Sequence, residues 1–446
     1  MRFGIYSVSI QSYFPANGGA MDTMELEVKL ETLMSLAMDD REGAPGSETM
    51  LPPRLRNANA AGALRPLNLR TVRIGANGPK AKLLRILMTN ACSFNCHYCP
   101  MRRDRELPRA LLKPQEMVRI FLEAVRRGWA SGLFLTTGIP GRPKKVMDDL
   151  IEVLATLRER HHYRGYIHVK IIPGADDAQI ERITALATRV SVNLETACNE
   201  TLAPIAPEKT FEQTLVTLRR AQAQSANAQM EERGGRPRDN LHPNGVAGMT
   251  TQFVVGATAD TDQTIIGKTT ELYAAGGVHH AQFSAFRPIR ETPMENVRAT
   301  PAIREHRLYQ ADHLLRRYGF TRDEIVFDGG GNLPLSYDPK VAAALAQRDR
   351  FPVDLNRADY PTLLRVPGLG PIVAKRIVEF RRTTAFRGLA DLRKLGATVS
   401  RAAGFLMLNG KRLGSDRWVE QLTLWTPEVD AGARVRAYEF SPGTFR

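Results

Sequence analysis

The stretch Met88-Thr89-Asn90-Ala91-Cys92-Ser93-Phe94-Asn95-Cys96-His97-Tyr98-Cys99-Pro100-Met101 decides how the rest of this chain is interpreted. It holds three of the four cysteines, with the spacing C-x3-C-x2-C. A loop this short can direct three thiolates at one point. Three thiolates are one fewer than a closed tetrahedral zinc site or an all-cysteine iron–sulfur site requires. The residues leave two completions open. Either His97 or the distant Cys198 supplies a fourth ligand, or one metal position stays free for a small molecule.

The residue before the last cysteine is Tyr98, so the motif reads C-x3-C-x-aromatic-C. In this form it resembles the motif of the radical S-adenosylmethionine (SAM) enzymes. The resemblance implies that Cys92, Cys96 and Cys99 hold a [4Fe–4S] cluster whose open iron binds SAM. It further implies that the reduced cluster cleaves SAM to methionine and a 5′-deoxyadenosyl radical, which takes a hydrogen atom from a substrate. Tyr98 is expected to contact the adenine, and an external donor such as flavodoxin or ferredoxin is expected to supply the electron.

The composition is that of a soluble protein with two or three domains, because 446 residues exceed the usual size of one core. The net charge is +15, from 62 basic and 47 acidic residues, which favours a polyanionic partner such as nucleic acid or else a solvated basic face. Four cysteines do not form a disulfide framework, and thiolate ligands need a reducing compartment, so we expect the cytoplasm. No apolar run approaches the roughly 20 residues of a membrane span. The first residues do not resemble a secretory signal, and Met21 or Met24 is a candidate start.

Apolar runs and amphipathic runs alternate through the middle of the chain. The predicted strands are 83–88, 133–137, 166–172, 190–195, 252–256 and 281–286. The predicted helices are 114–127, 144–160, 177–187, 211–223, 262–275 and 302–318. Strands and helices in alternation predict a parallel sheet with right-handed crossovers. Periodicity does not separate a doubly wound sheet from a barrel, but the resemblance implies a partial (βα)6 TIM-type barrel. The cysteines then follow the first strand, at the edge where α/β folds gather their chemistry.

Further positions match the radical SAM pattern in order along the chain. Thr136, Thr137 and Gly138 follow the second strand, where the family places a segment that meets the methionyl amino group of SAM. Asn193 and Glu195 alternate at the end of the fourth strand, where polar groups are expected to reach the ribose or carboxylate of SAM, although ordinary strand patterning gives the same alternation. Gly256 ends the fifth strand, and a glycine there lets the backbone approach the adenine ring closely.

Other residues near this edge have weaker signals. Cys198 is a candidate hydrogen-atom donor to a substrate radical or else an incidental thiol. Lys209 is a candidate partner for the SAM carboxylate or an exposed lysine. Arg287 and Arg290 follow the sixth strand and could hold a phosphate or carboxylate. The polar segment 224–244 is a substrate lid, a phosphate-contacting loop or an ordinary surface loop.

The C-terminal part contains a second motif, Val366-Pro367-Gly368-Leu369-Gly370-Pro371, between two helical stretches. It resembles the helix-hairpin-helix DNA-binding motif. Gly368 and Gly370 allow a tight turn, and the N–H groups that open the next helix can bind a phosphate. Lys375 and Arg376 add charge one turn later, so binding would read the DNA backbone rather than its sequence. A fainter copy follows at residues 389–406, and a small protein-docking module remains an alternative.

The order of the two modules resembles a bacterial family described as DNA modification or repair radical SAM proteins. We therefore expect a radical SAM enzyme that acts on DNA. The alternatives are a radical SAM enzyme acting on RNA and a non-enzymatic iron–sulfur protein that binds DNA or senses redox state. The expected segments are an N-terminal helix and wrapping arm (1–82), the barrel (83–320), a connector (321–350), an all-α helix-hairpin-helix module (351–412) and a tail (413–446).

Overall fold

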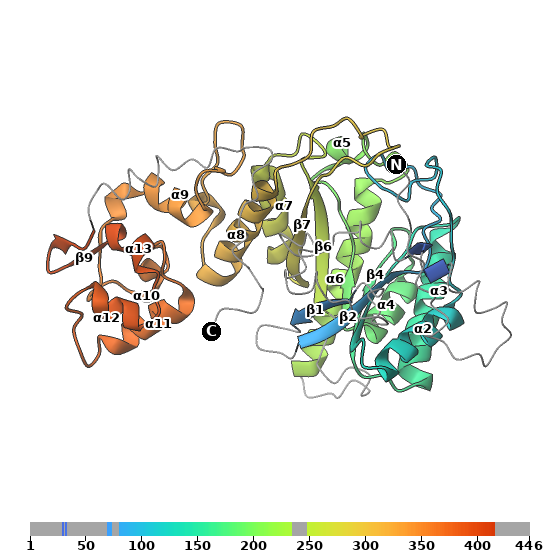
Figure 1. The fold of residues 1–446 in the computed structure, drawn as a ribbon, viewed down its shortest axis with the longest axis horizontal. Helices are drawn as coiled ribbons and strands as arrows, with labels where there is room; N and C mark the ends of the chain where they lie inside the picture. The colour runs from blue at the N-terminus through green and yellow to red at the C-terminus, as the bar shows by residue number, and fades with distance from the viewer. Residues whose placement is uncertain (1–28, 31, 34–68, 74–79, 234–247, 415–446) are drawn as a thin grey trace, which may run out of the picture.

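The computed structural model describes residues 29–30, 32–33, 69–73, 80–233 and 248–414. Figure 1 shows an α/β body and a smaller, mainly helical module that lies to one side of it, on the left in that view. The largest cluster of buried apolar residues is shared by both parts and includes Leu84 in the body and Leu408 in the module. None of the helices in these residues is long and apolar enough to cross a membrane.

The body is built on one seven-stranded sheet with its strands in chain order. The strands are β1 (Leu69–Arg73), β2 (Lys80–Leu87), β3 (Gly132–Thr136), β4 (Tyr166–Lys170), β5 (Arg189–Ser191), β6 (Gly248–Val255) and β7 (Val278–Ala285). β1 pairs antiparallel with β2, and all later pairs are parallel. The six parallel strands curl into a half-barrel, so the expected partial barrel is confirmed.

Helices connect the strands and cover the outer face of the sheet (Figure 1). They are α2 (Pro114–Arg126), α3 (Pro143–Ala155), α4 (Asp177–Leu186), α5 (Asn199–Leu202), α6 (Phe211–Arg233), α7 (Asp262–Ala274) and α8 (Ala302–Tyr318). α2 and α3 both start with proline, whose missing N–H costs nothing in a first turn. A five-residue π-helix, Thr156–Arg160, continues α3.

The open edge of the half-barrel is protected by side chains. In a parallel sheet every second N–H of the last strand points away from its neighbour and needs another acceptor. Along β7 the N–H of Ala281 donates to the Tyr273 hydroxyl at 2.8 Å, and that of Phe283 to the Tyr309 hydroxyl at 3.1 Å. The N–H of Ala285 donates to Glu305 Oε2 at 2.7 Å. α7 and α8 thus close the edge where a full barrel would continue.

The structure differs from the sequence-based expectations in a few places. Residues 69–73, expected within a loop-like arm, form β1, because their backbone pairs with β2. The fourth barrel strand, β5, is only three residues long, and beyond it the chain pairs with β6 again at an isolated bridge between Glu195 and Phe253. α6 runs to Arg233, into the segment 224–244 that was expected to be loop, and residues 234–247 lie outside the described residues. The same holds for the candidate starts Met21 and Met24 and for the tail from residue 415.

The C-terminal module is a pair of hairpins with a small sheet. Its elements are β8 (Val353–Asp354), α10 (Tyr360–Leu363), α11 (Pro371–Phe380), α12 (Leu389–Lys394), α13 (Val399–Ala402), β9 (Leu406–Leu408) and β10 (Lys411–Arg412). The helix α9 (Pro339–Ala346) precedes the module and contacts α8. The expected helix-hairpin-helix is therefore present, and the three short strands add a sheet of order β10-β9-β8 that the sequence did not predict.

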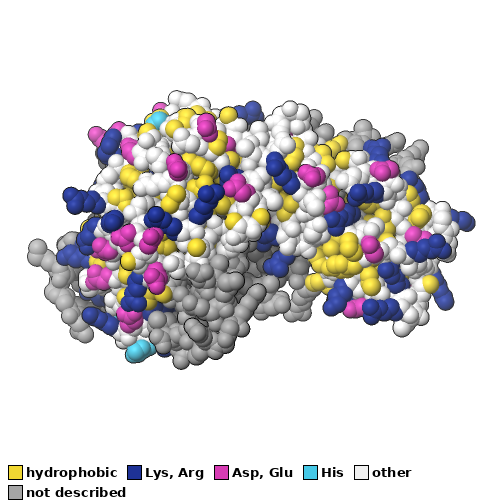
Figure 2. Space-filling model, turned by 180° about the vertical axis from the view of Figure 1, so that it is seen from behind, with side chains coloured by type: hydrophobic (Ala, Val, Ile, Leu, Met, Phe, Trp, Pro, Cys, Tyr) yellow, Lys and Arg dark blue, Asp and Glu magenta, His cyan; other side chains and the backbone are white. Residues whose placement is uncertain are grey.

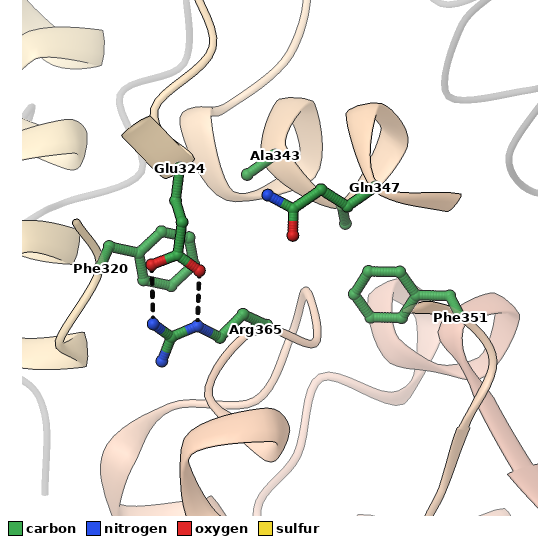
Figure 3. A pocket seen from close by; sticks show the side chains of 7 residues that line it. Phe320, Glu324, Ala343, Gln347, Phe351 and Arg365 are labelled. Atoms are coloured by element: carbon green, nitrogen blue, oxygen red, sulfur yellow. Dashed lines mark hydrogen bonds and ion pairs between the residues drawn. The ribbon is translucent and has the colours of Figure 1, made fainter. Parts of the chain in front are cut away.

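Specific polar contacts attach this module to the body. Arg365 donates to both carboxylate oxygens of Glu324, at 2.9 and 2.7 Å, and also to the carbonyl of Gly319 (Figure 3). The buried Lys340 donates to the carbonyl of Leu369, in the hairpin loop, at 2.5 Å. Because these groups are largely buried, the module has one preferred orientation on the barrel.

Candidate active site

The cysteine loop leaves β2 at its C-terminal end and returns before α2. Its two ends are joined at a neck of side-chain contacts. The fully buried Asn90 donates to the carbonyl of Pro108 at 2.7 Å and accepts from the N–H of Ala110 at 2.7 Å. Thr89 donates to the carbonyl of Ala110 at 2.6 Å and accepts from the N–H of Ala91 at 3.0 Å. The loop is thus closed at its base even though it has little regular secondary structure.

Arg109 organises the inside of the loop. One of its terminal nitrogens donates to the carbonyls of Asn90 and Met101, at 2.6 and 2.8 Å. The other donates to the carbonyls of Arg102, Arg103 and Arg105, at 2.6, 3.4 and 2.9 Å. Five carbonyls that point at one planar guanidinium give the loop a defined shape.

The loop also rests on the segment that follows β3. The Ser93 N–H donates to the Ile139 carbonyl at 2.8 Å, and the Gly138 N–H donates to the Thr89 carbonyl at 2.7 Å. A Cβ on Gly138 would lie 2.2 Å from the carbonyl oxygen of Ala91, so only glycine fits there. Thr136 and Thr137 are buried directly before it. The structure therefore brings the predicted segment 136–138 against the cysteine loop.

A third contact comes from the segment after α5. The N–H of His97 donates to the Ile205 carbonyl at 2.7 Å, and the N–H of Asn95 donates to Glu208 Oε2 at 2.9 Å. The next residue, Lys209, donates to Glu195 Oε1 at 3.0 Å, with side chains only 15% and 7% exposed. Lys209, a weak candidate from the sequence, is therefore a buried cation close to the cysteines.

Cys96 is buried, and Cys92 and Cys99 are half-buried. The three thiols are close enough that the charge of one raises the pKa of another. Burial raises the pKa of Cys96 to about 11, against a lowering effect of Lys209. Burial and the neighbouring Cys96 raise the pKa of Cys99 to about 12. Thiolates here therefore need a compensating positive charge, which ligated iron would provide. Cys92, Cys96 and Cys99 are thus of the donor type that iron–sulfur clusters use. Among the described residues, no three or more His, Cys, Asp or Glu side chains are grouped closely enough to hold a single metal ion.

Tyr98 lies between the cysteines and Glu195. Its burial, followed by the charge of Glu195, raises the pKa of Tyr98 well above its ordinary value, so the phenol stays neutral. Glu195 itself has a φ of 67°, in the left-handed region that few residues other than glycine adopt. The pairing of its backbone with Gln252 and Val254 maintains this conformation. Strain of this kind is often found at functional sites.

The remaining predicted residues have the following positions. Asn193 lies two residues before Glu195 in the chain, and its side-chain amide donates to Gln252 Oε1, on β6, at 3.2 Å. Gly256 has a φ of 78°, and a Cβ there would lie 2.1 Å from Thr300 Oγ1, so its immediate neighbour is a threonine of this chain. Cys198 caps α5, and its sulfur lies 3.3 Å from Thr201 Oγ1. The proposed roles of these residues toward SAM or substrate stay predictions.

The hairpin loop of the C-terminal module contains both glycines of the predicted motif. Gly368 has a φ of 82°, and a Cβ there would lie 2.6 Å from the carbonyl oxygen of Thr398, in the second hairpin. Gly370 caps the N-terminus of α11. Lys375 is well exposed, whereas Arg376 donates to the Leu395 carbonyl at 3.1 Å and so joins the two hairpins. The two hairpin loops therefore lie side by side.

Comparison with known families agrees with this geometry. Residues 86–227 match the model of the radical SAM superfamily, and residues 350–406 match the model of the helix-hairpin-helix motif. The chain therefore carries a radical SAM domain followed by a C-terminal helix-hairpin-helix motif. No curated protein matches the sequence.

Solved structures with partial similarity include two crystal structures. One is HydG, a maturase of the [FeFe]-hydrogenase, with 15% identity over 52% of this chain and 49% of that chain, at a TM-score of 0.41. The other is methylornithine synthase (PylB), with 14% identity over 52% of this chain and 61% of that chain, also at 0.41. The present chain thus overlaps about half of the first structure and three fifths of the second.

Sequence reasoning missed two features of this site. Arg109 has no motif of its own, and only the tertiary structure shows that five loop carbonyls converge on it. The ion pair of Lys209 with Glu195 joins residues 14 positions apart, and no sequence spacing predicts it. For Arg109, the signal available in the sequence was the cluster of arginines at residues 102–109.

Proposed function

We propose that this chain is a radical SAM enzyme that acts on DNA, either in modification or in repair. Cys92, Cys96 and Cys99 would hold a [4Fe–4S] cluster, and Tyr98, the segment 136–138, Asn193, Glu195 and Gly256 would hold SAM. When bound, the cluster and SAM together would supply the abstraction of a hydrogen atom from the substrate. An external donor such as flavodoxin or ferredoxin supplies the electron. Because the ligands are thiolates, the proposal includes a reducing compartment, the cytoplasm.

The protein's own residues hold and orient these groups. The neck at Asn90 and the carbonyls around Arg109 keep the three thiols in place. The neutral phenol of Tyr98 and the Glu195–Lys209 pair form a buried wall beside them, which excludes water from the reacting atoms. Cys198, held by Thr201, is the proposed hydrogen-atom donor at this edge.

The observation that carries the DNA assignment is the helix-hairpin-helix motif attached to the barrel through buried contacts. Gly368, Gly370 and the N-terminus of α11 would bind a phosphate, assisted by the charge of Lys375 and Arg376. Figure 2 shows Lys and Arg side chains along the outer edge of this module, on the right in that view. The net charge of +15 supports a polyanionic partner.

The test is anaerobic reconstitution with iron and sulfide, followed by dithionite, SAM and a pool of DNA, with mass spectrometry of the released nucleosides. A parallel reaction uses RNA of equal length. A new nucleoside from DNA alone supports the proposal. A product from RNA alone assigns the enzyme to RNA, and intact SAM under reduction leaves the iron–sulfur DNA-binding or redox-sensing alternative.

A further inference from the structure

The inner face of the half-barrel carries buried polar side-chain atoms that have no hydrogen-bond partner among the residues that the structure describes. His168, on β4, has an unpartnered Nε2 atom, and Ser191, on β5, has an unpartnered Oγ atom. Ser191 is 1% exposed and His168 is 9% exposed. Asn193 follows with an unpartnered Oδ1 atom. Burial of such groups without a partner is unfavourable, so proteins keep few of them without a reason.

These side chains share one face of the sheet. β4 pairs with β5 so that His168 lies opposite Arg189 and Lys170 lies opposite Ser191. Residues paired in this way point to the same side, and alternate residues point to the other side. The intervening residues, such as Val169 and Val190, are in the apolar cluster beneath the helices. His168 and Ser191 therefore face the interior of the half-barrel.

The two side chains lie below the cysteine loop at increasing depth. Glu195, which neighbours Tyr98 and Cys96, marks the level of the proposed cofactor site. Asn193 and Ser191 follow at every second residue down the same segment, and His168 lies on the neighbouring strand. The interior thus presents a polar column from the cysteines toward the floor of the barrel.

Aromatic and cationic side chains surround His168 at the floor of the barrel interior. The ring of Phe134 meets that of His168 edge to face at a centroid distance of 4.6 Å, and the guanidinium of Arg85 lies 4.7 Å from the centre of the same phenylalanine ring. Burial, then the charges of Arg189, Lys170 and Arg85, lower the pKa of His168 well below its ordinary value. A neutral imidazole and a hydroxyl each donate or accept, and the positive surroundings favour a ligand with carbonyl oxygens.

We propose that Ser191 and His168 form a subsite for the hydrogen-bonding edge of a nucleobase that has been turned out of the DNA stack. This inference rests on the proposed function and extends it by naming the part of DNA that enters the barrel. A nucleobase has hydrogen-bond donors and acceptors along one flat edge. The imidazole of His168 and the hydroxyl of Ser191 can likewise donate or accept, so the two sets are complementary. An inorganic anion has acceptors alone and could not donate to the side-chain oxygen of Asn193, at the upper rim of the subsite. It would therefore fit the subsite less well than a nucleobase.

The test uses reconstituted protein with SAM and no reductant, so that binding is measured without turnover. The probes are 2-aminopurine deoxyriboside, free in solution, and a duplex with one mispaired 2-aminopurine, both followed by fluorescence. The variants are Ser191→Ala and His168→Phe, which keeps the ring and removes its nitrogens. Thr184→Val is the matched control, because Thr184 Oγ1 is also buried without a partner but lies on α4, outside the barrel.

Each subsite variant is expected to weaken binding of the free nucleoside by about tenfold, the loss of roughly one buried hydrogen bond. The same variants should reduce the fluorescence change of the duplex while its total affinity, set by the hairpins, is retained. Thr184→Val should behave as wild type. Equal nucleoside affinities in wild type and both variants would overturn the subsite alone. Nucleoside binding that depends on Ser191, without any binding of duplex, would retain the subsite and reject the DNA assignment.

Discussion

Lys209 Nζ lies 3.0 Å from Glu195 Oε1, and this buried ion pair joins the segment after α5 to the strained residue beside the cysteines. Burial lowers the pKa of Lys209, but the charge of Glu195, followed by those of Cys96 and Cys99, outweighs burial and raises this pKa above its ordinary value. The ion pair between Lys209 and Glu195 therefore contributes to the electrostatic environment of Cys96 and Cys99.

Lys209→Met should destabilise the protein by about 3 kcal/mol, because it leaves the Glu195 carboxylate buried without its cation. Denaturant unfolding measures the change. The double variant Lys209→Met with Glu195→Gln should cost less than the sum of the two single changes, since neither charge is then left alone. Lys145→Met, which breaks an exposed pair with Asp149, is the control and should unfold as wild type does. Additive single effects would contradict a direct coupling.

Arg109→Lys should lower the amount of cluster that the protein retains after reconstitution. A lysine has a single charged nitrogen and does not span the five carbonyls that the guanidinium now holds together. Iron and sulfide per protein chain are the measurement. Arg103→Lys is the matched control, since that side chain is 55% exposed and its ion pairs, as far as the structure describes the chain, are with Asp104 and Glu208. Full iron content in the Arg109 variant would show that the loop does not depend on this residue.

Gly368→Ala should destabilise the C-terminal module by about 2 kcal/mol or more, because the new Cβ combines a left-handed φ with a contact of 2.6 Å to the Thr398 carbonyl oxygen. DNA affinity should fall with it. Gly388→Ala is the control, because its backbone is extended and no atom lies within 4 Å of the added Cβ. Thermal unfolding and DNA titration measure both effects. Unchanged DNA affinity in an unfolded or rearranged hairpin would favour a protein-docking role for the module.

Lys340 should make stability depend on pH. Burial lowers the pKa of Lys340 from 10.5 to about 7, partly offset by Asp338. The unfolded chain therefore binds one more proton than the folded chain between these two values, and stability should rise as the pH increases from about 7 toward about 10. The gain is at most about 4 kcal/mol. Urea unfolding of wild type and Lys340→Met across this range tests it. The Lys340→Met curve should lack the rise, and parallel curves would exclude the residue as its source.

The sequence by itself determined the parts of this protein that depend on short-range pattern. The spacing of Cys92, Cys96 and Cys99, the alternation of strands and helices, and the glycines of the hairpin are all local. Backbone geometry and ligand chemistry are enough to interpret these three patterns. The predicted helices begin within about two residues of the observed ones, because proline, cap residues and amphipathic periodicity act within a single turn.

The tertiary structure alone decided which distant side chains meet. Lys209 pairs with Glu195, Arg109 gathers the carbonyls of its own loop, Lys340 fixes the hairpin module to the barrel, and Ser191 faces the interior beside His168. Each contact depends on strand register and on the path that the chain follows after a strand ends. These are set by the packing of the whole sheet against its helices, a balance of many weak terms that no local pattern encodes.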